Sequence, residues 1–354
     1  MTPPPLAPSF PLPKHAFDKV RALTCISTTS HLLKTTSTIT QQQSLPTSPV
    51  SQPPSILFIG GKELCSLRVS LPWSLNHPSE DFKSVKMSTT TNETNNMLGS
   101  IYALHYNSNN NIINIGRHDG SIQQLDIRSH SIIHTVKAHD STVKCFSDRT
   151  CDDDNYTLLS GAYDGYVKMW DCRKFTQPIS TSSKHSGYVN AIHCYENDKI
   201  ITSSIDGICI FEMKHSKLAI LNKFKQKSEV LTSYMSNTSS VYPNYLYFAC
   251  KDGSVRVFDM NCFQVVYTMS ESNNISVNCM DCNGVSLFAC NNQGLVYEYS
   301  VEGMYEIAKH GTSTNTTKTS SMDSSIRSVC CFQKSHLFVG TQGGQVKCIQ
   351  VASF

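Results

Sequence analysis

Six hairpin-like segments recur along this chain at a nearly constant spacing. Each consists of an apolar stretch, a few small residues, a turn that contains glycine and a second apolar stretch, as in LLSGAYDGYVKMWDCR at 158–173. The turn glycines lie 45, 42, 46, 41 and 50 residues apart, at Gly120, Gly165, Gly207, Gly253, Gly294 and Gly344. Such a period indicates one supersecondary unit that repeats, and it constrains the fold more than any single motif does.

Short apolar segments before and after the hairpins add two strands to each unit. They are rich in β-branched and aromatic residues, which favour strands. They lie before the hairpins at 141–147, 187–194, 229–235, 275–282 and 325–332, and after them at 132–139, 217–224 and 264–270. One more hairpin, at 55–69 with a strand at 20–27 before it, precedes the six. Four strands per period in the low forties are typical of propeller blades. The sequence therefore predicts an all-β chain that forms a single seven-bladed β-propeller of four-stranded antiparallel blades over residues 1–354.

The last blade lacks a fourth strand of its own, because its hairpin ends at Val351. We expect residues 9–18 to supply that strand from the N-terminal side and so to close the ring. Pro11 and Pro13 fall within this segment. Proline is tolerated in an outermost, edge strand, where no backbone donor is needed on the outer side.

Three polar stretches interrupt the repeat. We expect disordered or loop insertions at about 28–54, 76–97 and 311–324. The first overlaps a Ser/Thr-rich segment, 14–45, whose composition is similar to that of an organellar transit peptide. An insertion is favoured, because cleavage of a transit peptide would remove the strand at 20–27 that the first blade needs.

Composition bears on the compartment and on the class of partner. The fifteen cysteines are an odd number and many lie in apolar strand-like runs, which favours reduced, buried thiols over a disulfide framework. We therefore expect a cytoplasmic and/or nuclear protein. The net charge of +3 does not indicate nucleic-acid binding. Without a run of about 18 apolar residues or a secretory signal, no membrane partner is expected either.

The third unit resembles the WD-repeat family. Ala138-His139 stands where the family has Gly-His, Asp164 is the turn aspartate, and Trp170-Asp171 is the dipeptide that closes the third strand. The resemblance implies a buried hydrogen-bond chain, which consists here of His139, Ser160, Asp164 and Trp170. A buried indole N–H and a buried imidazole need such partners.

The other units match the family pattern only in part. The fourth unit keeps His185, Thr202 and Asp206 for a second chain of this kind, but it has Phe211 in place of tryptophan. The last two units have Gln293 and Gly343 where the pattern has aspartate. We therefore expect most blades to be held by apolar packing rather than by polar chains.

Three groups of residues are of the types found in catalytic or metal-binding sites, but for each we expect a structural role. His139, Ser160 and Asp164 are the residue types of a catalytic triad, but the repeat places them inside one blade. The C-x-x-C at 279–282 puts two thiols on opposite faces of a strand, where they cannot easily chelate one ion. The acidic run 151–154 reads as a solvated loop. No catalytic, cofactor-binding or metal site is predicted, and the chain is not expected to be an enzyme.

Two surfaces are candidates for binding partner proteins. The positions just before the turn residues project, in this family, from the face that most often meets partners, and here they are His118, Tyr163, Ile205, Lys251, Asn292 and Gln342. The second surface carries Arg173, which follows Trp170-Asp171, and Arg128, its equivalent one unit earlier. Trp-Asp-x-Arg resembles the box of WD-repeat substrate receptors of cullin–RING ubiquitin ligases, in which the arginine faces the ligase adaptor. Such an arginine can also pair with the aspartate of its own strand.

These observations lead to one functional expectation and two alternatives. We expect a non-catalytic protein–protein interaction scaffold without a cofactor, monomeric within a larger hetero-complex. The first alternative is a substrate receptor that binds a ubiquitin-ligase adaptor through Arg128 and Arg173. The second is a component of a ribonucleoprotein assembly, which requires a basic patch that forms only in three dimensions.

Overall fold

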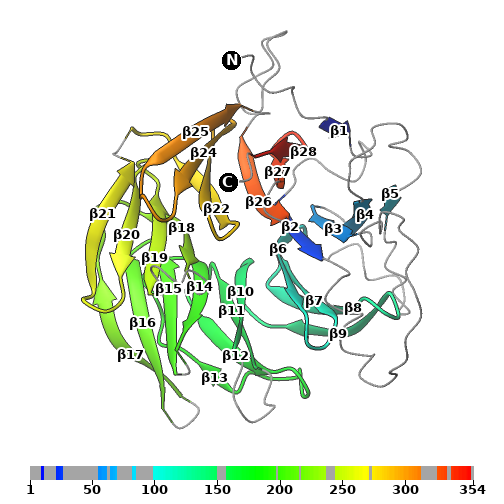
Figure 1. Ribbon diagram of the computed structural model, residues 1–354. Coiled ribbons are helices and arrows are strands. Elements are labelled where there is room, and N and C mark those ends of the chain that lie inside the picture. Colours follow the sequence, from blue (N-terminus) through cyan, green and yellow to red (C-terminus); the bar gives the residue numbers. More distant parts are fainter. Residues whose placement is uncertain are drawn as a thin grey trace, which may run out of the picture.

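A computed structural model describes residues 9–11, 21–26, 55–61, 64–69, 82–84, 99–149, 157–196, 198–214, 217–236, 244–270, 273–311, 325–332 and 336–351. Every element in this part of the chain is a β-strand, and the strands form seven four-stranded antiparallel sheets. The sheets stand around a central axis as blades (Figure 1). The predicted seven-bladed β-propeller is therefore confirmed.

Blades one to six take their strands in chain order, from the axis outward. Blade one contains β2 (Ala22–Ile26), β3 (Ser55–Gly60), β4 (Leu64–Val69) and β5 (Phe82–Ser84). Blade two contains β6 (Ile101–Asn107), β7 (Ile112–Arg117), β8 (Ser121–Asp126) and β9 (Ser131–Lys137). Blade three contains β10 (Val143–Arg149), β11 (Thr157–Ala162), β12 (Val167–Asp171) and β13 (Ser180–Thr181). Blade four contains β14 (Val189–Tyr195), β15 (Lys199–Ser204), β16 (Gly207–Lys214) and β17 (Lys217–Phe224).

The remaining three blades complete the ring. Blade five contains β18 (Val230–Met235), β19 (Tyr245–Cys250), β20 (Val255–Asp259) and β21 (Gln264–Ser270). Blade six contains β22 (Val277–Cys282), β23 (Ser286–Asn291), β24 (Leu295–Ser300) and β25 (Glu306–Gly311). Blade seven contains β26 (Ile326–Phe332), β27 (His336–Thr341), β28 (Gln345–Gln350) and β1 (Ser9–Pro11). The innermost strand of each blade contacts that of the next, and β2 contacts β26 where the ring closes.

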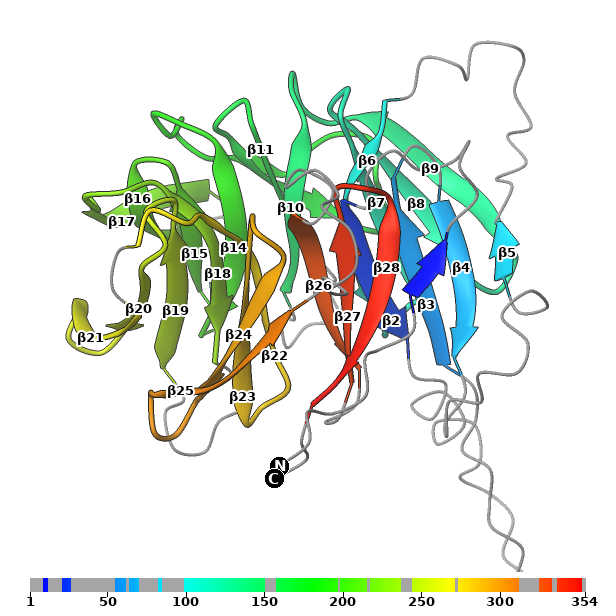
Figure 2. The ribbon, with the colours of Figure 1, turned by 90° about the horizontal axis from the view of Figure 1, so that it is seen from above.

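The N-terminal strand closes the propeller. β1 pairs with β28 in an antiparallel register that sets Phe10 opposite Val346. The first and last strands of the chain thus share one sheet, as the blue and red ribbons of Figure 2 show. The predicted closure is confirmed for residues 9–11, and the rest of the predicted segment, 12–18, lies outside the described residues.

Of the three expected insertions, only that at 76–97 contains a strand among the described residues. Residues 28–54 and 312–324 lie outside the described part of the chain, and Gly311 is the last residue of β25. Within the expected insertion at 76–97, Phe82–Ser84 form β5, which pairs with β4 and sets Phe82 opposite Leu67. That interval is therefore not wholly an insertion, because it contains the outer strand that blade one needs.

Small residues on the second strands allow neighbouring blades to approach closely. A methyl group added to Gly161 of β11 would lie 2.7 Å from Cγ1 of Val189, the first residue of β14 in the next blade. A methyl group on Gly116 of β7 would likewise lie 2.8 Å from Cγ1 of Val143, the first residue of β10. These glycines are the small residues that precede each turn in the repeat. They let a β-branched side chain from one blade seat directly on the backbone of the previous blade.

Burial falls from the inner and middle strands to the outer edge. Every residue of β7, β11 and β23 is buried, whereas most of β9 and β21 is exposed. Apolar clusters fill the spaces between blades, as where Ile208 and Ile210 of blade four meet Val230, Leu246 and Phe248 of blade five. The core is thus a ring of interfaces between neighbouring sheets.

Candidate interaction face at the channel mouth

The polar chain in blade three links four side chains through one serine. The indole Nε1 of Trp170 donates to Oγ of Ser160 at 2.9 Å, and Nε2 of His139 lies 2.8 Å from the same oxygen. Nδ1 of His139 lies 2.9 Å from Oδ2 of Asp164. A neutral imidazole with its proton on Nδ1 satisfies every donor in this chain. The chain joins the third strand to the turn between the second and third strands.

The carboxylate of Asp164 anchors that turn. It accepts backbone hydrogen bonds from Tyr166 at 3.0 Å and from Asp140 at 3.1 Å, in addition to its contact with His139. Burial by itself would raise the pKa of Asp164, but these hydrogen bonds outweigh it and leave the pKa below its usual value. The carboxylate is therefore ionised at neutral pH, where it holds the turn and the imidazole together.

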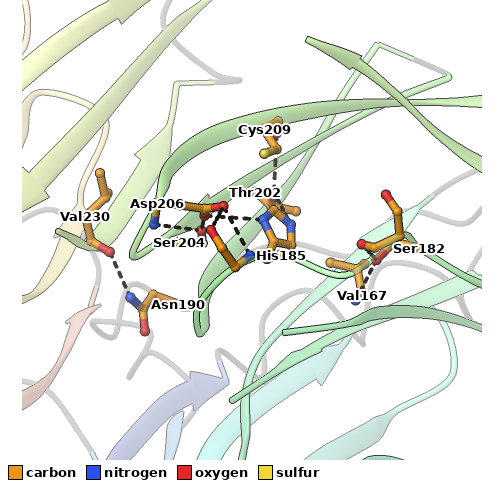
Figure 3. Close-up of polar contacts among 11 residues, drawn as sticks. Val167, Ser182, His185, Asn190, Thr202, Ser204, Asp206, Cys209 and Val230 are labelled. Carbon is orange, nitrogen blue, oxygen red and sulfur yellow. Dashed lines mark hydrogen bonds and ion pairs between the residues drawn. The ribbon is translucent and has the colours of Figure 1, made fainter. Parts of the chain in front are cut away.

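Blade four contains a looser version of the same chain (Figure 3). Oγ1 of Thr202 lies 3.2 Å from Nε2 of His185, whose Nδ1 lies 3.6 Å from Oδ1 of Asp206. Phe211 presents its edge to the imidazole with ring centroids 5.5 Å apart. Burial lowers the pKa of His185 although Asp206 opposes the shift. The structure thus brings together all seven side chains named from the sequence, in two chains that each lie within one blade.

The six turn positions lie at equivalent points of blades two to seven. In each, the backbone N–H donates to the carbonyl of the residue that lies directly before the innermost strand of the same blade. The pairs are His118–Ser100, Tyr163–Thr142, Ile205–Tyr188, Lys251–Glu229, Asn292–Ser276 and Gln342–Ser325, at 2.8 to 3.3 Å. The side chains of His118, Lys251 and Asn292 are exposed, and the other three are partly exposed. All six therefore belong to one face, which we call the turn face.

A second ring of residues on the turn face was not found from the sequence. The innermost strand of six blades carries a β-bulge at its second residue, where the pairing register skips one position. The skipped residues are Tyr102, Lys144, Asn190, Leu231, Asn278 and Arg327. In blade one Arg21 takes this place, because Ala22 pairs with Gly60 as Ala103 pairs with Gly116. A bulge re-aims its side chain, and here six bulges do so toward one axis, where Arg21 adds the seventh side chain.

The seven residues line the mouth of the central channel. They surround a cavity of about 240 Å³ on the axis, together with small and apolar residues of the innermost strands. The signal in the sequence was the residue that follows the first β-branched residue of each inner strand, as in TVK, YVN, SVN and SIR. We call these seven side chains the mouth ring.

Four aromatic side chains form a row on the turn face beside the mouth. Tyr102 stacks on His118 with centroids 5.5 Å apart and meets the edge of Tyr163 at 6.4 Å. Tyr163 in turn stacks on Tyr188 at 4.4 Å, and Tyr188 is 47% exposed. The guanidinium of Arg21 lies 4.2 Å above the ring of Tyr102. This row, which we call the aromatic row, joins two residues named from the sequence with two that were missed.

Arg128 and Arg173 lie at the opposite end of the blades from the turn face. Each follows a third strand and donates its backbone N–H to the aspartate two residues earlier at 2.9 Å, Asp126 or Asp171. Nε of Arg173 also donates to Oδ1 of Asp171 at 3.2 Å, in an exposed ion pair. These hydrogen bonds hold the pKa of Asp171 below its usual value. Arg173 thus pairs with the aspartate of its own strand, which was the alternative to contact with a ligase adaptor.

The C-x-x-C splits between two interfaces, as expected from its spacing. Cys279 packs against the cluster between blades six and seven, and Cys282 against the cluster between blades five and six. Burial raises the pKa of Cys282 to about 11, so this thiol stays protonated. The twelve cysteines with described side chains are free thiols, and no group of three potential metal ligands occurs in the described residues. The acidic run 151–154 lies outside those residues.

Comparison with known proteins agrees with this geometry. The family profile "WD domain, G-beta repeat" matches residues 130–171, which hold the polar chain of blade three. The crystal structure of the WD40 beta propeller domain of Doa1 superposes with a TM-score of 0.68 over 98% of this chain and 97% of that domain, at 15% sequence identity. The chain is a β-propeller that contains a WD repeat at 130–171.

Two curated proteins are similar to part of this propeller. Myosin heavy chain kinase C of Dictyostelium discoideum is 25% identical over 150 residues, and the CCR4-associated factor 4 homolog of Vanderwaltozyma polyspora is 27% identical over 171 residues. Each match covers 42% of this chain, and it spans 17% and 24% of the two relatives. The described part of the propeller contains no helix that could cross a membrane.

Proposed function

We propose that this WD-repeat propeller is a non-catalytic scaffold that binds partner proteins through its turn face. The aromatic row carries the proposal. Its rings are held by mutual stacking, so little side-chain freedom is lost when a partner covers them, and yet Tyr188 remains 47% exposed. Ordered, accessible tyrosines of this kind are typical anchors of protein interfaces.

The burial of the triad-like residues supports a non-catalytic role. Ser160 has 0% exposure, and its hydroxyl oxygen is already engaged by Trp170 and His139. A nucleophile must reach a substrate atom, which this hydroxyl cannot do while it lies inside the blade. The residues that could suggest hydrolysis thus stabilise the sheet, and the accessible features of the turn face are suited to binding.

Loss of the aromatic anchors is the direct test. Tyr163→Ala with Tyr188→Ala is compared with wild-type protein and with Tyr267→Ala, a control that removes a tyrosine of 44% exposure from the outer strand β21. Tagged proteins are purified from cells and the recovered proteins are quantified by mass spectrometry. We expect partners that wild type and the control retain to fall at least tenfold with the double variant. Equal recovery by all three proteins would rule out the turn face as the binding surface.

The same purification decides the alternatives. A ligase receptor predicts that a ubiquitin-ligase adaptor is recovered with wild type and lost with Arg128→Ala and Arg173→Ala together, although these arginines lie far from the turn face. A ribonucleoprotein component predicts that recovery depends on RNA and is lost after ribonuclease treatment. We further propose a cytoplasmic and/or nuclear location, which the free thiols support, and a monomeric propeller, which light scattering of the purified protein checks.

A further inference from the structure

The mouth ring concentrates positive charge without compensation. Arg21, Lys144 and Arg327 all line the 240 Å³ cavity, and none of the described residues that line it is an aspartate or glutamate. Burial lowers the pKa of Lys144, and the charges of Arg327 and Arg21 lower it further. The three cations thus act on one another across the channel. Like charges gathered in a partly desolvated site are unfavourable unless an anion joins them.

Polar contacts fix the frame around these cations. Nδ2 of Asn190 donates to the carbonyl of Val230 in the next blade at 2.8 Å (Figure 3). Nδ2 of Asn278 donates to the carbonyl of Ile326 at the same distance, again from one blade to the next. Two members of the ring are therefore tied to the neighbouring bulges, which makes the mouth a preorganised site.

The arginines are held by neutral groups that leave their charge intact. Nε of Arg327 donates to Oε1 of Gln342 at 3.1 Å, and Arg21 lies on the face of Tyr102 at 4.2 Å. A guanidinium held in this way keeps its full positive charge and remains suited to an oxyanion, to which it can present two parallel N–H groups. By contrast Lys251, on the same face, is paired with Glu229 at 3.1 Å and does not line the cavity.

We propose that the mouth of the channel binds a phosphoryl group carried on a side chain of the partner protein. Three cations match a group that bears nearly two negative charges and three acceptor oxygens better than they match one carboxylate. The aromatic row borders the mouth, so a peptide that covers it can place a side chain in the cavity. This inference rests on the proposed function, since it names the chemistry that the same face recognises.

Peptide libraries test the ligand class directly. The purified full-length protein is immobilised and offered three libraries with random flanking residues and a fixed phosphoserine, serine or glutamate. We expect retention of phosphoserine peptides, displacement of these peptides by inorganic pyrophosphate, and weaker retention at higher salt. Retention of none of the libraries, or equal retention of the serine library, overturns the proposal. Equal retention of the glutamate library overturns the assignment to phosphate in favour of a carboxylate.

Matched variants tie binding to the mouth ring. Arg21→Gln and Arg327→Gln should each weaken phosphopeptide binding about tenfold or more, because each removes a charge-assisted contact. Lys309→Gln removes an exposed charge from the outer strand β25, which is not part of the turn face, and should change binding less than twofold. Unfolding midpoints of all variants establish that they are folded. Unchanged binding in both arginine variants overturns the site.

The outcome is separable from that of the proposed function. If partners recovered from cells depend on Tyr163 and Tyr188 but survive phosphatase treatment and Arg327→Gln, the scaffold role stands and the phosphoryl site falls. If partners are insensitive to the tyrosines as well, the turn face itself is not the binding surface.

Discussion

Removal of one hydroxyl from blade three should destabilise the whole propeller measurably. Ser160 is the hub of the polar chain, since its Oγ meets both Nε1 of Trp170 and Nε2 of His139. The variant Ser160→Ala deletes the hub without adding volume. Both ring nitrogens lie on side chains of 1% exposure, so water cannot replace the lost partner.

The magnitude follows from the two groups that are left unpaired. A buried polar group without a partner costs about 1–3 kcal/mol, so Ser160→Ala, which leaves two such groups, is expected to cost about 2–6 kcal/mol. Thr202→Val in blade four is the matched comparison, because it keeps the side-chain shape and leaves one imidazole nitrogen, that of His185, unpaired. It should cost about 1–3 kcal/mol.

A double-mutant cycle isolates the contact with the indole. In a Trp170→Phe background no indole N–H remains to be orphaned, so Ser160→Ala should cost about 1–3 kcal/mol less than in wild type. The measurement is urea unfolding followed by far-ultraviolet circular dichroism, with one common slope for the four proteins. A cost below about 1 kcal/mol for Ser160→Ala, or the same cost in both backgrounds, would falsify the view that this chain stabilises the blade.

Three further predictions follow from other parts of the ring. Gly161→Ala should lower the urea midpoint, because the added methyl group would lie 2.7 Å from Val189 of the next blade; an unchanged midpoint would contradict close blade packing. Burial lowers the pKa of His193 to about 4 against 6.5 when unfolded, so the unfolded chain binds the proton first, and stability should fall by about 3 kcal/mol as pH drops from 6.5 to 4. His193→Gln should flatten that profile relative to the exposed control His130→Gln, and an unchanged slope would refute the assignment. Proteolytic cleavage within 28–54 should leave both fragments associated on gel filtration, because the strands on either side pair with each other; separation of the fragments would contradict the pairing of β2 with β3.

The repeat could be derived from the sequence because nearly every blade is built from one continuous segment of the chain. Its four strands follow one another within about 45 residues, and glycine marks the same turn each time. The polar chain of blade three was likewise recognisable, since His139, Ser160, Asp164 and Trp170 fall within one repeat. What failed was the boundary of a weakly patterned segment: a strand as short as β5 has no period that sets it apart from a polar loop.

The mouth ring could not be found in this way, because its charge is dispersed along the chain. Arg21, Lys144 and Arg327 are separated by 123 and 183 residues and belong to three different blades. The net charge is only +3, and nothing in the sequence distinguishes these three residues from its other lysines and arginines. Two facts of the folded chain bring them together. The first is the ring geometry, and the second, for Lys144 and Arg327, is the bulge that turns the second residue of the inner strand toward the axis.

The pairing of β1 with β28 determines the order in which the propeller can close during synthesis. During synthesis β1 leaves the ribosome early, but its partner strand begins 334 residues after Pro11. At about 5–20 residues per second, β1 waits for roughly 17 to 67 seconds with its backbone groups unmatched. The propeller can assemble blade by blade from blade one onward, yet the seal between its two ends forms last. If a ribosome stalls within blade seven, the nascent chain therefore remains an open ring. The unpaired edge of its sheet is then accessible to chaperones and proteases.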